Sequence, residues 1–176
     1  MNEYNINCKW VLWFHSLTEN KWTKTSYKEL CEINSLTDLK SLMDILNMQH
    51  LQNGMYFLMR ENIFPNWEDP DNREGGCWSY KVSSKKIKSI WDKLLENCII
   101  ENILDPEDTK SDDDNIQFNM DEINGISISP KKEFNIIKIW NKNSDKVIDL
   151  KLEDTHKLLE DESYIKFLYA HMNEVD

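Results

Sequence analysis

The residues whose types could bind a ligand lie first in the turn-rich segment 63–78, IFPNWEDPDNREGGCW. Pro, Asn, Asp and Gly favour chain reversal, so this composition predicts a polar surface loop. Trp67 nevertheless stands in the middle of the segment, with Glu68 directly after it. Trp22 lies in a second polar turn, in the sequence NKW. Two indoles in turns, one of them beside a carboxylate, favour a slot that holds a base; the alternative is that each indole is a lid packed over the core.

Such a slot would select its ligand by stacking, charge and hydrogen bonding. Stacking a base on an aromatic ring contributes about 1–3 kcal/mol, and a cationic base adds cation–π attraction, which is strongest over Trp. The Glu68 carboxylate accepts hydrogen bonds and donates none, so it selects a base edge rich in N–H donors, such as that of guanine. The neighbouring Lys131 and Lys132 could then contact phosphates.

The sequence gives little evidence for catalysis or metal binding. The run Asp112-Asp113-Asp114 lacks the glycine and the spaced terminal glutamate of an EF-hand, so we interpret it as a solvated loop. No nucleophile elbow or kinase signature is present. The histidines show no metal-binding spacing and are assigned structural or surface roles: His15, His50, His156 and His171. We therefore predict no catalytic residue, metal or cofactor, and a binding protein rather than an enzyme.

The composition is that of an ordinary globular chain, with 40% hydrophobic and 30% charged residues. A length of 176 residues favours one domain spanning residues 1–176. The net charge of −11 argues against sequence-independent binding to a nucleic-acid backbone, although a small basic pocket stays compatible with it. The sequence shows no run of 18 apolar residues and no secretion signal, so we expect no membrane association.

Residue usage indicates the compartment and the source of the chain. The four cysteines include no C-x-x-C pair, which favours free thiols in a reducing cytoplasm. Arg60 and Arg73 are the only arginines among 21 basic residues, and Asn and Ile are heavily used. This bias is typical of an AT-rich coding genome.

Apolar periodicity predicts both strands and helices. Strands are expected over Lys9–Ser16, Ser26–Ile33, Met55–Arg60, Cys77–Ser83, Gly125–Ser129, Phe134–Asn141 and Ser163–Met172. Helices are expected over 34–48, capped by Asn34 or Ser35, over 84–103, capped by Ser83 or Ser84, and over 152–161. The acidic segment Asp105–Glu122 is expected to be a long loop. This order favours an α+β fold, an antiparallel sheet with helices on one face. Four tryptophans lie in apolar periodic segments and are assigned to the core: Trp10, Trp13, Trp78 and Trp91.

The spacing of the tryptophans resembles that of the cap-binding translation initiation factor 4E family, from about Lys9 to Met172. The matching stretches are KWVLWF, the loop Trp of NKW, YFLMRENIFPNWED, GGCW with its Trp eleven residues after Trp67, and IIKIW ending at Trp140. The resemblance implies a curved antiparallel sheet with about three helices on its convex face. It also implies that the messenger RNA cap is held on the concave side.

The resemblance implies a role for each matching residue of the slot. Trp22 and Trp67 would sandwich the cationic 7-methylguanine base, while Glu68 would accept two hydrogen bonds from the guanine edge. Trp140 would contact the methyl group. The triphosphate would meet the lysines that remain nearby, Lys131, Lys132 and Lys138.

The chain also departs from the family pattern in its basic residues. The family has an Arg directly before the Trp that matches Trp78, and this chain has Cys77 there. The family has a Lys four residues before the Trp that matches Trp140, and this chain has Ile136 there. The family's phosphate-binding Arg, nine residues before that Trp, is Lys131. We therefore expect a phosphate pocket with less charge than the family usually has.

The resemblance implies a second surface, for a scaffold protein of the initiation complex. Its residues would be Leu36, Leu39, Lys40, Met43 and Trp91. Lys40 stands where the family has an exposed Trp, and Tyr4-Asn5 replaces the family's His-Pro near the N-terminus. A non-standard scaffold partner is therefore expected.

The function that the resemblance implies is recruitment of capped messenger RNA for translation initiation by a cytoplasmic protein that is a monomer on its own. Two alternatives stay open. The chain could be a cap-binding repressor or decoy, or an interaction module of the same fold without cap affinity. The divergent partner surface and the AT-rich composition favour a large DNA virus or a divergent protist as the source.

Overall fold

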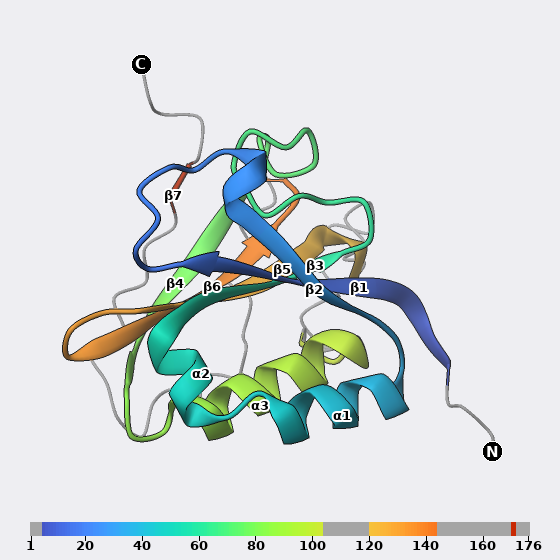
Figure 1. Cartoon of the computed structure of the whole chain (residues 1–176). Helices are drawn as coiled ribbons and strands as arrows, with labels where there is room; N and C mark the ends of the chain where they lie inside the picture. The colour runs from blue at the N-terminus through green and yellow to red at the C-terminus, as the bar shows by residue number, and fades with distance from the viewer. Residues whose placement is uncertain (1–4, 104–119, 144–169, 172–176) are drawn as a thin grey trace, which may run out of the picture.

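A computed structural model describes residues 5–103, 120–143 and 170–171 of the chain. A seven-stranded sheet with the order β2-β1-β3-β5-β6-β4-β7 forms its centre, and every pair of neighbouring strands is antiparallel. The sheet is curved, and the helices α1, α2 and α3 all lie on one side of it (Figure 1). The predicted α+β class, with its antiparallel sheet and three helices on one face, is confirmed.

The elements follow one another along the chain in an order close to the predicted one. The strands are β1 (Asn5–Ser16), β2 (Tyr27–Ser35), β3 (Gly54–Arg60), β4 (Gly76–Ser83), β5 (Ile123–Pro130), β6 (Phe134–Asn141) and β7 (Ala170–His171). The helices are α1 (Leu36–Ile45), α2 (Met48–Asn53) and α3 (Ile87–Ile99), with short 3-10 turns at η1 (Lys24–Ser26) and η2 (Met120–Glu122). The predicted strands over 77–83 and 134–141 match β4 and β6 to within one residue.

The helix expected over 34–48 is interrupted. The Ser35 hydroxyl caps α1 by accepting a 3.2 Å hydrogen bond from the Asp38 N–H, as predicted. α1 ends at Ile45, and Asn47 then starts α2 with a reciprocal capping box to His50. The apolar spacing continues across the break, so periodicity alone predicted a single unit. The cap expected for α3 is also wrong, because the helix begins at Ile87, three residues after Ser84.

The sheet carries an apolar layer on each face. The main core lies between the sheet and the helices, and its largest fully buried side chains include Trp10, Trp78 and Trp91. A smaller cluster on the opposite face contains Tyr27, Met55, Phe57, Met59 and Trp140. Trp13 is partly buried and packs on this second cluster, edge-on to Phe64 at 5.2 Å. Side chains alternate between the faces of a strand, so β3 is apolar throughout because both of its faces are covered.

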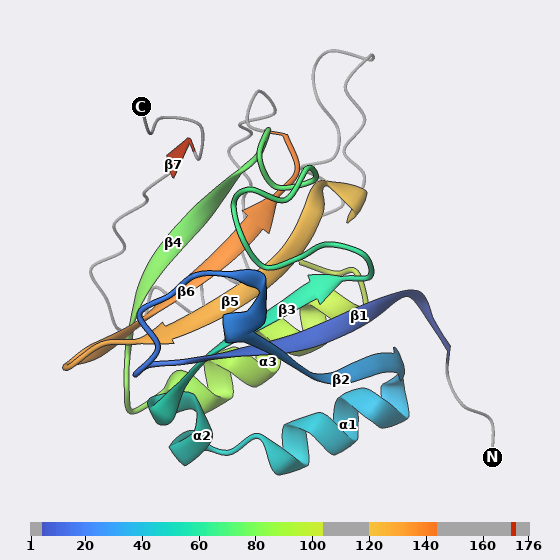
Figure 2. The ribbon, with the colours of Figure 1, turned by 45° about the horizontal axis from the view of Figure 1, so that its top comes forward.

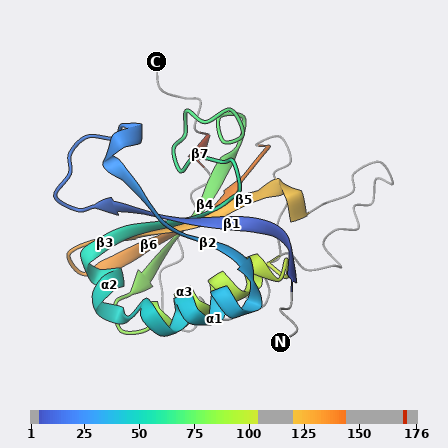
Figure 3. The ribbon, with the colours of Figure 1, turned by 45° about the vertical axis from the view of Figure 1, so that its right-hand side comes forward.

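Two loops cover the face opposite the helices. The connection between β1 and β2 carries η1, and the long connection between β3 and β4 spans residues 61–75. Both loops stand on the side of the sheet away from α1 and α3 in two views (Figures 1 and 3). When the top of the molecule comes forward, the two loops are seen in front of the sheet (Figure 2).

Some predictions fall on other parts of the chain. The helix expected over 152–161, most of the strand Ser163–Met172 and residues 105–119 of the acidic segment lie outside the described residues. All four cysteines are described and carry free thiols. None of the helices within residues 5–103 and 120–143 is long and apolar enough to cross a bilayer.

Candidate functional site

A cavity of about 680 Å³ opens between the two loops on the face opposite the helices. Both turn indoles, Trp22 and Trp67, line it, as does the Glu68 carboxylate. These two indoles are 54% and 48% exposed, although the other large aromatic side chains of the cavity are buried. The predicted slot residues from two separate loops therefore meet at one cavity.

Trp22 stands on a loop that buries none of its own side chains. Residues 17–25 are all exposed, and η1 contains no buried residue. The indole lies flat against the His15 ring, with the two ring centres 4.1 Å apart and an angle of 7° between the planes. One face of Trp22 is therefore covered by an imidazole.

His15 is a fully buried polar residue at the end of β1. Its Nδ1 atom lies 3.0 Å from the Ser16 carbonyl oxygen, and its Nε2 atom lies 3.0 Å from the Lys21 carbonyl oxygen. The sequence analysis gave His15 only a structural or surface role and missed its contact with the slot. The alternation of β1 was the available signal, because Trp13 and His15 share the face opposite Leu12.

The loop that carries Trp67 is held by its own polar side chains. The Asp69 carboxylate accepts hydrogen bonds from the backbone N–H groups of Phe64 and Asp71, both at 3.0 Å. The Asn66 side-chain oxygen accepts one from the Asp69 N–H at 2.9 Å. These bonds on both sides of Trp67 explain why a turn-rich segment can present an indole in one orientation.

Two buried asparagines attach this loop to the sheet. Asn72 is 1% exposed, and its amide donates to the carbonyl oxygens of Phe64 and Asn66 at 2.9 and 2.8 Å. Asn124 of β5, fully buried, donates to the Asp71 carbonyl oxygen at 2.7 Å and to the Asn72 side-chain oxygen at 2.9 Å. The position of Trp67 therefore depends on a residue that follows it by 57 positions in the sequence.

The Gly-Gly pair at the end of this loop has a steric cause. A Cβ atom added at Gly75 would lie 1.9 Å from the Asn141 carbonyl oxygen, so no larger residue fits there. The Gly76 N–H donates to the Asn141 side-chain oxygen at 3.0 Å. The pair thus brings the loop back against β6, which ends beside the cavity.

Glu68 is exposed and lies close enough to Tyr27 to act on it electrostatically. Burial raises the pKa of the Tyr27 phenol to about 12, and the negative charge of Glu68 adds to the shift. Tyr27 is edge-on to His15 and to Phe64, at 4.9 and 5.0 Å. This tyrosine therefore stays neutral at physiological pH and forms a rigid support beneath both loops.

The floor of the cavity is formed by the second apolar cluster. Trp140 is 6% exposed, and its Nε1–H donates to the Ser127 hydroxyl at 2.9 Å. Phe57 meets the Trp140 ring edge-on, with ring centres 6.4 Å apart. The predicted residue Trp140 therefore lines the cavity in one fixed orientation, while the supporting residues Tyr27, Met55, Phe57 and Ser127 were not predicted.

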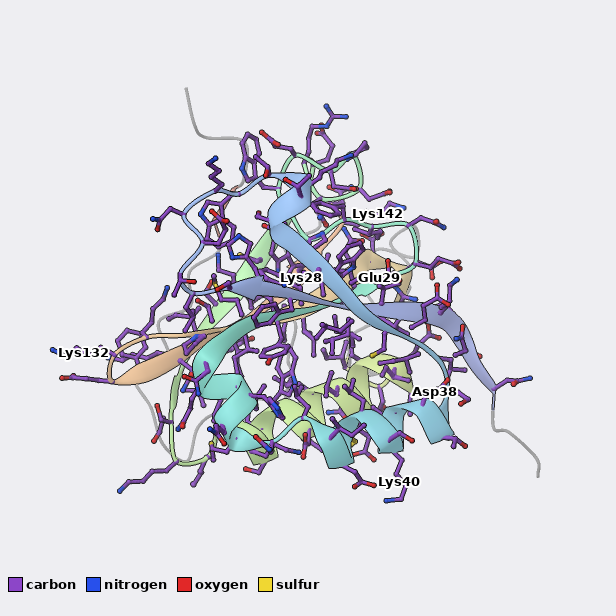
Figure 4. The ribbon with its side chains drawn as sticks, in the orientation of Figure 1. Lys28, Glu29, Asp38, Lys40, Lys132 and Lys142 are labelled. Atoms are coloured by element: carbon purple, nitrogen blue, oxygen red, sulfur yellow. The ribbon has the colours of Figure 1, made fainter. Side chains whose placement is uncertain are left out.

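The three predicted phosphate-binding lysines do not all line the cavity. Lys131 and Lys138 line the cavity. Lys132 does not; it sits at the tip of the hairpin between β5 and β6 and points away from the sheet (Figure 4). Its assignment to the ligand site is corrected, because the hairpin turn directs neighbouring side chains in different directions.

The predicted partner surface is only partly accessible. Lys40 projects from α1 away from the sheet and forms an ion pair with Asp44 at 3.3 Å (Figure 4). Leu36 and Met43 are partly exposed. Leu39 and Trp91 are 5% and 0% exposed and belong to the main core, so their assignment to a contact surface is corrected.

No group of three or more His, Cys, Asp or Glu side chains in the described part of the chain is arranged to hold a metal ion. The cavity brings together two exposed indoles, a carboxylate and two lysines on the face of a curved antiparallel sheet opposite its helices. Such a set of residues is suited to stacking on a flat ligand and hydrogen bonding to its edge.

Known proteins resemble this chain in sequence. A profile of the family described as Eukaryotic initiation factor 4E matches residues 5–175. The chain is 26% identical over 180 residues to the Eukaryotic translation initiation factor 4E of Candida albicans, which covers 94% of this chain and 79% of that protein. It is 29% identical over 117 residues to the Eukaryotic translation initiation factor 4E homolog of Acanthamoeba polyphaga mimivirus, over 58% of this chain and 39% of that one.

The fold has a counterpart among solved structures as well. The complex of C. elegans eIF4E-3 with the 4E-binding protein Mextli and a cap analog superposes with a TM-score of 0.76 at 21% identity. That superposition covers 96% of this chain and 92% of the C. elegans chain. The chain belongs to the eukaryotic initiation factor 4E family.

Proposed function

We propose that this chain binds the 7-methylguanosine cap of messenger RNA, as a single domain over residues 1–176, and recruits capped RNA for translation initiation. The observation that carries the proposal is the meeting of Trp22, Trp67 and Glu68 at one cavity. Family membership supports it, and the C. elegans relative was solved with a cap analog.

The base is recognised by charge and by its hydrogen-bonding edge. Methylation at N7 makes guanine cationic, and a cation is attracted to the electron-rich faces of both indoles. Glu68 accepts hydrogen bonds from the ring N–H and the exocyclic amine of guanine. Trp140, held by Ser127 at the floor, contacts the methyl group.

The triphosphate meets Lys131 and Lys138 at the edge of the cavity. A lysine is a point charge and lacks the bidentate fork with which an arginine binds phosphate. The phosphates therefore add less affinity here than a pair of arginines would, and the base contributes the larger share.

A scaffold protein of the initiation complex binds the helical face. Leu36, Lys40 and Met43 are the predicted contact residues that remain accessible there. A lysine at the centre of this surface favours a partner that offers an acidic group, and therefore a non-standard scaffold. The relatives named above are initiation factors, and this favours the recruiting role over a repressor, a decoy or a module without cap affinity.

The proposed protein acts in the cytoplasm, as a monomer until it meets its scaffold, and uses no cofactor. It holds the cap and does not cleave it.

Retention on immobilised 7-methylguanosine triphosphate tests this function. We expect the purified chain to be retained, to be eluted by free 7-methylguanosine triphosphate, and to resist elution by the same concentration of guanosine triphosphate. Trp67→Leu should abolish retention, whereas Glu74→Gln, an exposed change in the same loop, should leave it intact. Flow-through of the parent protein would refute the proposal.

A further inference from the structure

We propose that His15 is a positioning residue for Trp22 and holds this wall of the slot by stacking against the indole and by hydrogen bonds to the loop. The consequence for ligand binding rests on the cap-binding function proposed above. The consequence for the Trp22 loop does not, because it concerns the free protein.

The first observation is that the Trp22 loop has few anchors of its own. Every side chain from Leu17 to Thr25 is exposed, and the other ring contacts of the loop are longer: Trp22 to Tyr27, with ring centres 6.1 Å apart, and Lys24 Nζ to the centre of the Phe64 ring at 5.8 Å. The flat contact with His15, at 4.1 Å and 7°, joins the indole to a fully buried residue of β1. The same contact covers one face of the indole and leaves the other for a ligand.

The second observation is the set of hydrogen-bond partners around the imidazole. Ser16 and Lys21 both present carbonyl oxygens to it, one to each ring nitrogen at 3.0 Å. A carbonyl oxygen accepts hydrogen bonds from an imidazole N–H. The ring nitrogens therefore lie at hydrogen-bond distance from the backbone of two different segments.

The Ser26 hydroxyl is a third polar neighbour of the ring. Ser26 Oγ lies 3.2 Å from His15 Nε2 and donates to the Thr23 carbonyl oxygen at 2.7 Å. The imidazole therefore has polar neighbours on both sides of Trp22 in the sequence.

The two hydrogen bonds connect different parts of the chain. Ser16 is the last residue of β1, whereas Lys21 precedes Trp22 in the loop. The ring thus ties the backbone next to Trp22 to the sheet while it supports the indole from behind.

Three variants separate the contributions of His15. His15→Leu removes the ring and both hydrogen bonds, and His15→Phe keeps a ring for stacking but removes the hydrogen bonds. His50→Leu is the matched control, since His50 is an exposed histidine that caps α2 on the other face of the sheet. Circular dichroism establishes that each variant is folded.

The readouts are amide hydrogen exchange over residues 17–26 in the free protein and the dissociation constant for 7-methylguanosine triphosphate. We expect His15→Leu to speed exchange at least tenfold in this loop and to weaken binding at least tenfold. His15→Phe should lie between His15→Leu and the parent, and His50→Leu should match the parent in both. Parent-like exchange in folded His15→Leu would overturn the proposal.

If the parent does not bind 7-methylguanosine triphosphate, the proposed function fails, whereas the exchange results still decide the role of His15.

Discussion

Glu68 is the residue on which selection of the base depends in the proposed function. It is exposed at the edge of the slot, and no hydrogen bond joins it to another side chain within the described part of the chain. A carboxylate that is free to accept two hydrogen bonds distinguishes guanine, which presents two adjacent N–H donors, from bases that lack such a pair.

Glu68→Ala should therefore nearly abolish cap binding while the fold stays intact. A hydrogen bond to a charged group contributes about 1.5–3 kcal/mol, and two would be lost, which corresponds to at least about a 100-fold loss of affinity. Titration with a cap analogue measures the loss, and Glu74→Ala serves as the control in the same loop. Near-normal binding by Glu68→Ala would remove this residue from the site.

A second prediction at the residue scale concerns the contribution of the two cavity lysines to triphosphate binding. Changing both Lys131 and Lys138 to Ala should weaken binding of the triphosphate about 2- to 30-fold, because an exposed ion pair contributes about 0.2–1 kcal/mol. The salt dependence of binding should decrease as well. Lys132→Ala is the matched control, since this side chain points away from the cavity (Figure 4). An effect of Lys132→Ala equal to that of the double change would contradict the assignment.

The raised pKa of Tyr27 predicts how the free energy of unfolding changes with pH in the alkaline range. Burial and Glu68 raise the pKa of its phenol from 10.0 to about 12, so folding favours the protonated form. The resulting stabilisation is complete below pH 10 and is lost as the pH rises towards 12. The free energy of unfolding of the parent should therefore fall more steeply over this range than that of Tyr27→Phe. Parallel curves for the two proteins would contradict the prediction.

At the scale of the elements, the asparagine pair decides whether the Trp67 loop keeps its place. Asn124→Ala leaves the Asp71 carbonyl oxygen and the Asn72 side-chain oxygen without their buried donor. An unsatisfied buried polar group costs about 1–3 kcal/mol, so we expect a lower free energy of unfolding and weaker cap binding. Asn53→Ala, which removes an exposed local hydrogen bond in α2, should change neither. Cap affinity of Asn124→Ala equal to that of the parent would show that the loop does not depend on this anchor.

The strands and helices were largely predictable because their apolar residues recur with the period of each structure. β6 and β4 were found to within a residue, and the stripe of α3 that includes Ile90, Trp91 and Leu94 is buried as expected. The break between α1 and α2 was not found, because Asn47 acts through a cap while the apolar spacing continues across it. The ends of helices and strands depend on single polar contacts, which the periodicity of apolar residues does not reveal.

The sequence predicted those residues of the candidate site whose type is unusual for their local segment. It did not predict those whose type is common in such a segment. Trp22, Trp67 and Glu68 stand out as an indole pair and a carboxylate in polar turns. His15, Ser127 and Asn124 are common residue types in ordinary strands, and their roles come from partners in other strands and loops. Only the strand order and register bring these residues together.

At the scale of the whole molecule, the proposed function gives the two faces of the sheet different tasks. One face carries the proposed cap slot and the other carries α1 and α3, where Lys40 projects away from the sheet (Figures 1 and 4). The family resemblance implies an exposed Trp at the position of Lys40. An aromatic anchor commonly contributes about 2 kcal/mol or more to an interface. The usual scaffold peptide therefore loses a main contact on this chain.

Lys40→Trp should restore binding of a scaffold peptide that standard family members recognise. We expect affinity to rise at least about tenfold, in line with an anchor of about 2 kcal/mol. Ser41→Trp, at the next exposed position of α1, should give no comparable gain. Tight binding of this peptide by the unchanged chain would contradict a non-standard partner.

Calorimetric titration with 7-methylguanosine triphosphate and with guanosine triphosphate, at one salt concentration, tests the central claim most directly. The two ligands share the triphosphate and the N–H donors of the guanine edge, and they differ in the N7 methyl group and the positive charge that it adds. Cation–π attraction of about 0.5–2 kcal/mol at each of two indoles predicts that the methylated nucleotide binds at least about fivefold more tightly. Equal affinities, or no measurable binding of either nucleotide, would contradict a cap-binding slot formed by Trp22 and Trp67.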